Sequence, residues 1–105
     1  MNQPSTPVPF ISRLFVGHDS KFETELVFGE KGCVSPREEH AFFELIVVVE
    51  GKIQITYENI NNPQLHESYS LIEVPAGTLH QISFLGDENK LVIIHPDRSL
   101  EGAAK

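Results

Sequence analysis

The chain has 105 residues, of which 40% are hydrophobic and 22% charged, and its formal net charge is −7. This length suits one domain with one core. Its eight lysines and arginines are scattered, whereas nucleic acid or an anionic membrane surface would need a basic patch, so we expect neither partner. The lone cysteine, Cys33, excludes an internal disulfide, which fits a reducing cytoplasm.

The chain begins with three prolines within residues 1–9, which predict an extended or disordered N-terminal arm. Short segments of β-branched, aromatic and alternating residues follow, separated by turn residues. They predict strands at residues 10–16, 22–28, 41–50, 52–57, 71–74, 80–84 and 91–94. This spacing is typical of an all-β sandwich or barrel, which we place at residues 10–98, with a frayed tail at 99–105.

Two of these segments carry polar residues on an apolar face. Side chains alternate between the two faces of a strand. In an extended chain over residues 38–48, one face therefore holds Glu38, His40, Phe42, Glu44, Ile46 and Val48. In the 80–84 segment, His80 likewise shares a face with Ile82 and Phe84. Both segments therefore aim histidines or carboxylates inward.

Buried carboxylates need a partner, because burial without one costs free energy. A divalent cation would offset the carboxylate charge, and neutral imidazoles would supply nitrogen lone pairs. The interior of a barrel offers rigid strands to hold such ligands. The sequence therefore indicates a metal site built from inward-facing His and Glu residues.

The spacing of these residues resembles the cupin family. The first cupin motif is a glycine, five residues, His-x-His, three or four residues, Glu, six residues and a glycine; the second contains Pro-x-Gly, two residues and His. This chain has matching residues at Gly32, Glu38-Glu39-His40, Glu44 and Gly51, then Pro75-Ala76-Gly77 and His80. It departs from the family at Glu38, Tyr69 and Phe84, which replace a histidine, a glycine and an asparagine.

The resemblance implies a cupin-type jelly-roll β-barrel, also called a double-stranded β-helix. It places His40, Glu44 and His80 at metal-ligand positions. Glu38, which stands where the first histidine would be, is expected either as a further ligand or as a catalytic general base. The expected metal is Mn, Fe, Ni or Zn, because carboxylates shift the preference away from copper. His95 follows the last predicted strand, just before Pro96, and is expected at most at the edge of the pocket, not among the ligands.

Two functions follow from this site, which we expect to be walled by Phe42, Tyr57, Ile82 and Phe84. The first is a metal-dependent enzyme of the dioxygenase, isomerase or lyase type, acting on a small organic molecule. The alternative is a non-catalytic sugar- or metabolite-binding or sensing module. Phe43-Glu44-Leu45 and the Pro75–His80 turn resemble the barrel domain of AraC-like regulators. In those domains such residues bind a sugar or form hydrogen bonds with one another. A storage role would not explain buried carboxylates.

The segment 41–50 is apolar on both faces. Leu45, Val47 and Val49 are as apolar as Ile46 and Val48, and a strand of this kind is usually buried on both sides. A barrel this small leaves few elements to cover the outer face. We therefore expect a homodimer through this sheet.

Overall fold

The computed structural model describes residues 9–18, 21–58 and 62–97. The strands are β1 (Phe10–Val16), β2 (Glu23–Glu30), β3 (Glu44–Glu50), β4 (Lys52–Tyr57), β5 (Gln64–Glu67), β6 (Leu71–Val74), β7 (His80–Phe84) and β8 (Glu88–His95). The all-β prediction is confirmed. None of the described residues forms a helix that could span a membrane. The expected arm and tail lie outside the described residues, apart from Pro9.

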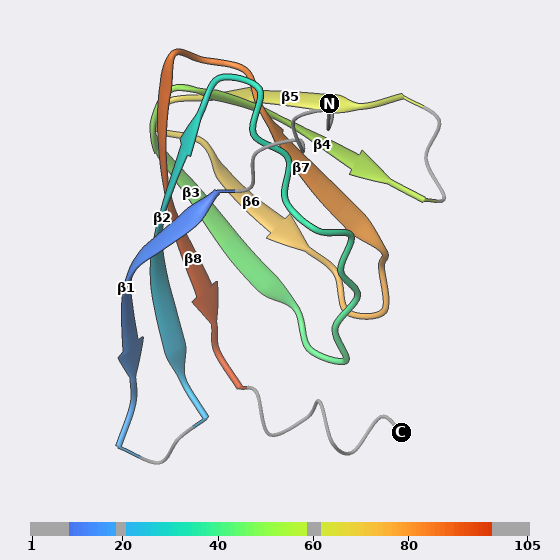
Figure 1. Ribbon diagram of the computed structural model, residues 1–105. Helices are drawn as coiled ribbons and strands as arrows, with labels where there is room; N and C mark the ends of the chain where they lie inside the picture. The colour runs from blue at the N-terminus through green and yellow to red at the C-terminus, as the bar shows by residue number, and fades with distance from the viewer. Residues whose placement is uncertain (1–8, 19–20, 59–61, 98–105) are drawn as a thin grey trace, which may run out of the picture.

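The strands form two antiparallel sheets that enclose the core (Figure 1). One sheet has the order β1-β2-β8-β3-β6, and the other has the order β5-β4-β7. Neighbours in a sheet are often distant in sequence: β8 lies between β2 and β3. This strand order brings residue 95 beside residue 23, which no local pattern predicts.

The core lies between the sheets and is built by alternation along the strands. In β3, Glu44, Ile46 and Val48 are buried, whereas Leu45 and Val47 on the other face are partly covered. Ile53 and Ile55 of β4 and Ile82 and Phe84 of β7 face them from the other sheet. Burying each of these large side chains contributes roughly 1.5–3 kcal/mol, so this alternation is the main source of stability.

At one end of the molecule, the Asn89 side chain joins the end of β2, the start of β4 and the turn before β8. Its side-chain oxygen accepts hydrogen bonds from the backbone of Lys52 (2.8 Å) and Gly86 (3.2 Å), and its amide donates to Gly29 and Gly86 (both 2.9 Å). Gly51 has φ +102°, and a Cβ there would meet the Asn89 side chain. Glycine is therefore required at Gly51, both for its backbone conformation and for space.

The structure corrects two sequence predictions about strands. The strand expected at 41–50 begins only at Glu44, and residues 38–43 form an irregular segment. It is held to β7 by an isolated bridge between Glu38 and His80. The short strand β5 was not predicted, because its sequence, Gln-Leu-His-Glu, has little of the β-branched or aromatic character that marks strands.

Candidate metal centre

Glu44 is the centre of the polar cluster. It opens β3 with its side chain turned into the barrel, and it is only 3% exposed. Burial by itself would raise the pKa of this carboxyl. Contacts with His40, His80 and His95 outweigh burial and lower the pKa below its usual range. Glu44 is therefore a buried anion that is kept ionised by imidazoles.

Three imidazoles reach the Glu44 carboxylate from three separate parts of the chain. His40 Nε2 lies 3.4 Å from Oε2, and His80 Nε2 lies 3.4 Å from Oε1. His95 Nε2 lies 2.9 Å from Oε2, in hydrogen-bond geometry. His40 comes from the irregular segment before β3, His80 from β7 and His95 from β8. The predicted residues His40, Glu44 and His80 are thus brought together, with His95 beside them.

His80 is oriented by the turn that precedes β7. Its Nδ1 lies 3.0 Å from the Thr78 carbonyl oxygen. A carbonyl oxygen can only accept, so Nδ1 is the donor in this bond. The other nitrogen, Nε2, is left facing Glu44, where it can take a proton or bind a metal ion. This arrangement fixes the ring as metal-ligating histidines require.

His40 lies between two carboxylates. Its Nε2 is 3.1 Å from Glu38 Oε2 and 3.4 Å from Glu44 Oε2, and no well-aligned hydrogen bond reaches this buried nitrogen. Phe42 stacks on the ring at a centroid distance of 4.8 Å. Glu38 first and Glu44 second raise the pKa of His40 to about 9. Without a metal ion, His40 is therefore protonated at neutral pH.

Glu38 does not occupy the buried position that the alternation predicted. Its side chain is 45% exposed. The prediction was wrong because residues 38–43 are not a strand, so the two-residue alternation does not extend back to Glu38. Two backbone hydrogen bonds of 2.9 Å pair Glu38 with His80. Glu38 therefore stands at the edge of the cluster, next to His40.

His95 is the cluster residue that the sequence analysis left out. The predicted last strand ended at residue 94, whereas β8 extends to His95. Alternation from the buried Leu91 through Ile93 places His95 on the inner face, and its side chain is 7% exposed. Extending the alternation by one residue would have identified it.

The four residues expected as walls are all buried. Phe42 packs against His40 and meets the His95 ring edge-on at 5.1 Å. Tyr57 pairs with His80 across β4 and β7. Phe84 lies at the far end of β7 from His80 and packs against Gly29, so it is a core residue remote from the cluster.

Two pairs of donor atoms in the cluster have separations that fit ligands of a divalent ion. Two ligands of a tetrahedral ion with bonds of about 2.1 Å lie roughly 3.4 Å apart, and the His40–Glu44 and His80–Glu44 distances are both 3.4 Å. His40, Glu44 and His95 offer one donor atom each, all within 4.8 Å of one another. Among the described residues the set His40, Glu44 and His80 does not meet that spacing, and its two imidazoles face different oxygens of Glu44. The buried Nε2 of His40, which has no hydrogen bond, is the kind of group that a metal ion would satisfy.

Comparison with solved structures shows the fold. An RmlC-like cupin family protein from Methanocaldococcus jannaschii superposes with a TM-score of 0.79 at 10% identity, over 100% of this chain and 93% of that one. The Cnp3 cupin domain from Schizosaccharomyces pombe gives 0.77 at 17% identity, covering 99% and 74%. A cupin-2 domain protein from Shewanella frigidimarina gives 0.65 at 24% identity, covering 81% and 80%.

No family model and no curated protein matches the sequence. The evidence is therefore structural: two antiparallel sheets in the order described, superposing on cupins over most of both chains. The first of these proteins is described as a double-stranded β-helix. The chain has the cupin fold, the double-stranded β-helix that its two motifs predicted.

Proposed function

We propose that this protein binds one divalent metal ion through His40, Glu44 and His80, and uses it as an enzyme acting on a small organic molecule. One observation carries the proposal: a buried, ionised carboxylate with imidazole nitrogens facing both of its oxygens. Such a set of two imidazoles and one carboxylate leaves coordination positions for substrate on Mn, Fe, Ni or Zn.

His95 is assigned a supporting role at this site. Its Nε2 lies 2.9 Å from Glu44, which is a hydrogen-bond distance and shorter than the separation of two ligands on one ion. Because the ionised Glu44 can only accept, His95 Nε2 donates. This bond would hold the Glu44 carboxylate in place for the metal, as partners of ligating carboxylates commonly do.

The chemistry would be divided between the ion and Glu38. When bound, the ion would act as a Lewis acid toward a substrate oxygen. Glu38 is next to the ligand His40 and is partly exposed, so substrate can approach it. A carboxylate in that position can accept a proton from the substrate, which is the role of a general base. Dioxygenase, isomerase and lyase reactions all suit such a site.

A second candidate function is non-catalytic binding of a sugar or metabolite. The observation that favours it is that Glu44 has three imidazole partners, so its charge is compensated within the cluster itself. A cluster whose polar groups pair with one another could also bind the hydroxyl groups of a ligand. In that case the protein would carry no stoichiometric metal, and loss of one imidazole would weaken ligand binding without changing any metal content.

Metal content distinguishes the two candidates. Untagged protein, purified without chelators, should carry close to one equivalent of Mn, Fe, Ni or Zn by elemental mass spectrometry. His80→Ala should lose that metal, whereas the exposed His18→Ala is the matched control and should retain it. A wild type that carries no metal would overturn the metal proposal and favour the binding module.

We also propose a cytoplasmic location. Cys33 is a free thiol buried in the core, and a chain without disulfides suits a reducing compartment. Cell fractionation with an antibody to the native chain would test this, and recovery in a secreted or periplasmic fraction would contradict it.

A further inference from the structure

The second nitrogen of His95 has no role in the site described above. The side chain is 7% exposed, and Nδ1 is buried without a hydrogen bond. It lies 3.6 Å from Glu23 Oε1 and 3.9 Å from Glu25 Oε1. A buried ring nitrogen without a hydrogen-bond partner calls for an explanation, and here it is aimed at two carboxylates.

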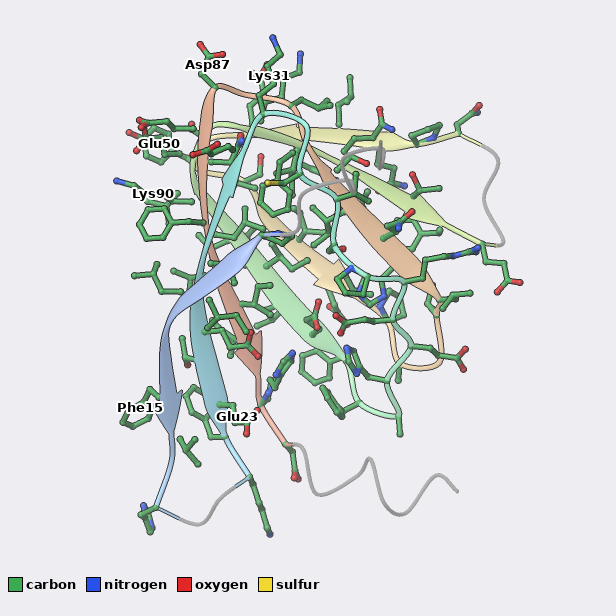
Figure 2. All side chains as sticks on the ribbon, in the orientation of Figure 1. Phe15, Glu23, Lys31, Glu50, Asp87 and Lys90 are labelled. Atoms are coloured by element: carbon green, nitrogen blue, oxygen red, sulfur yellow. The ribbon has the colours of Figure 1, made fainter. Side chains whose placement is uncertain are left out.

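The strand register produces this arrangement. Glu23 and His95 are direct partners in the antiparallel pair of β2 and β8, so their side chains point to the same face. Glu25 follows two residues later on that face. Their side chains are only 16% and 17% exposed. Figure 2 shows Glu23 at the start of β2, beside the end of β8, whereas Phe15 lies on β1, on the other side of β2.

The hydrogen bond on the other side of the ring determines what Nδ1 presents. Since His95 Nε2 donates to Glu44, the neutral ring carries its lone pair on Nδ1. That lone pair and two carboxylates, all acceptors, then face one another. A proton on Nδ1 would pair the ring with these carboxylates, and a divalent cation would in addition bind both carboxylates at once. The two distances, 3.6 and 3.9 Å, exceed a hydrogen bond and fit ligands that share one ion.

The surrounding charge favours a cation as well. Four carboxylates influence this region, namely Glu23, Glu25, Glu38 and Glu44. Three imidazoles, His40, His80 and His95, surround them. Burial raises the pKa of Glu25; His95 opposes this rise, and the neighbouring carboxylates of Glu38, Glu44 and Glu23 add to it.

We propose that Glu23, Glu25 and His95 Nδ1 form a second divalent-cation site, separate from the one at His40, Glu44 and His80. Two carboxylates and one imidazole suit Mn²⁺ or Zn²⁺. The His95 ring lies between the two sites, donating to Glu44 on one side and binding the second ion on the other. The second ion would also cross-link β2 to β8.

The test is metal stoichiometry, measured by equilibrium dialysis with Mn²⁺ and separately with Zn²⁺. Wild type should bind two equivalents, and the double variant E23Q/E25Q should bind one equivalent fewer. His80→Ala should lose only the ion at Glu44. The control E73Q/E88Q changes two exposed carboxylates and should bind as wild type does. Retention by E23Q/E25Q of the full wild-type stoichiometry would overturn the second site.

These variants separate this proposal from the proposed function. If the site at Glu44 fails, wild type and His80→Ala should bind the same single equivalent, and E23Q/E25Q should bind none. Thermal unfolding gives a second measurement. In the His80→Ala background, saturating Mn²⁺ should still raise Tm, and adding E23Q/E25Q should abolish that rise. If E23Q/E25Q does not fold, the single substitution E25Q is compared in the same way.

Discussion

Glu44 differs from an ordinary buried carboxylate in the number of its partners. It is buried at the first residue of β3, and three imidazoles keep it charged. A buried charge of this kind is stable only while its partners remain, and removal of one side of a buried ion pair is strongly destabilising. The site therefore depends on this one carboxylate more than on any single histidine.

Glu44→Gln should reduce affinity for Zn²⁺ or Mn²⁺ at least about a hundredfold, because the variant keeps the size of the side chain and loses its charge. Isothermal titration with each metal would measure this change. Glu73→Gln, on the exposed face of β6, is the control and should leave affinity within a factor of about two. Metal affinity unchanged in Glu44→Gln would remove Glu44 from the ligand set.

His40 should make the metal-free protein less stable at alkaline pH. Its pKa is about 9 in the folded protein, against 6.5 ordinarily. A raised pKa contributes stability that is complete below the unfolded value and is lost as pH rises through the folded value. Linkage limits this contribution to about 3 kcal/mol, and partial exposure reduces it. Urea unfolding with EDTA should therefore show stability falling from about pH 7 to 9.5.

His40→Gln should reduce this loss of stability at alkaline pH. An equally steep loss in the variant would show that His40 is not its source.

Metal binding should have the opposite pH dependence. A metal ion must displace the proton on His40, so affinity for Zn²⁺ should rise over the same pH range. Titrations at several pH values, with proton release followed in two buffers, would check this.

At the scale of elements, β8 organises the molecule. It pairs with β2 on one side and β3 on the other, and it begins at the Asn89 junction and ends at the metal cluster. The two ends of this strand therefore serve different purposes. Asn89 holds the turns in register, and His95 reaches the carboxylates of both neighbouring strands.

Asn89→Ala should destabilise the protein by about 2–3 kcal/mol, since it leaves backbone groups of Lys52, Gly86 and Gly29 without their partner. The change lies at the opposite end of β8 from the cluster, so metal stoichiometry should be retained. Urea unfolding against the exposed Asn62→Ala would measure the difference. A loss below about 0.5 kcal/mol would show that water replaces the side chain.

At the scale of the whole molecule, the outer face of the larger sheet is apolar. Leu26, Val92, Val47 and Leu71 form one row of cross-strand partners over β2, β8, β3 and β6. Leu71 is 68% exposed. A row of this kind on a protein surface is typical of an interaction site. We propose that a second copy of the chain covers it, as the sequence of β3 led us to expect.

Sedimentation at micromolar concentration should show a dimer. Leu71→Glu should shift it to a monomer, because the exposed side chain can carry a charge without disturbing the core, and a charge facing its symmetry mate would be repelled. Leu65→Glu, at a position 56% exposed on the other sheet, is the control and should remain dimeric. A monomeric wild type would exclude this interface.

Local sequence patterns were sufficient for most of the strands, for the burial of Glu44 and His80, and for the cupin fold. These features depend on side-chain alternation within single strands and on the spacing of two motifs, at residues 32–51 and 75–80, all of which can be read from the sequence. The strand at residues 64–67 was missed because its pairing with β4, and not its own residues, makes it a strand.

The sequence by itself determined that Glu44 and His80 would face the interior, because two-residue alternation is a local property of strands, whereas His40 lies in the irregular segment before β3. Only the tertiary structure decided that Glu38 lies at the edge, since the chain before Glu44 is irregular and its alternation fails. It also decided the role of His95, which touches Glu44 and faces Glu23 because β8 is inserted between β2 and β3. Such pairings between distant strands reflect the packing of the whole chain, which no short segment encodes.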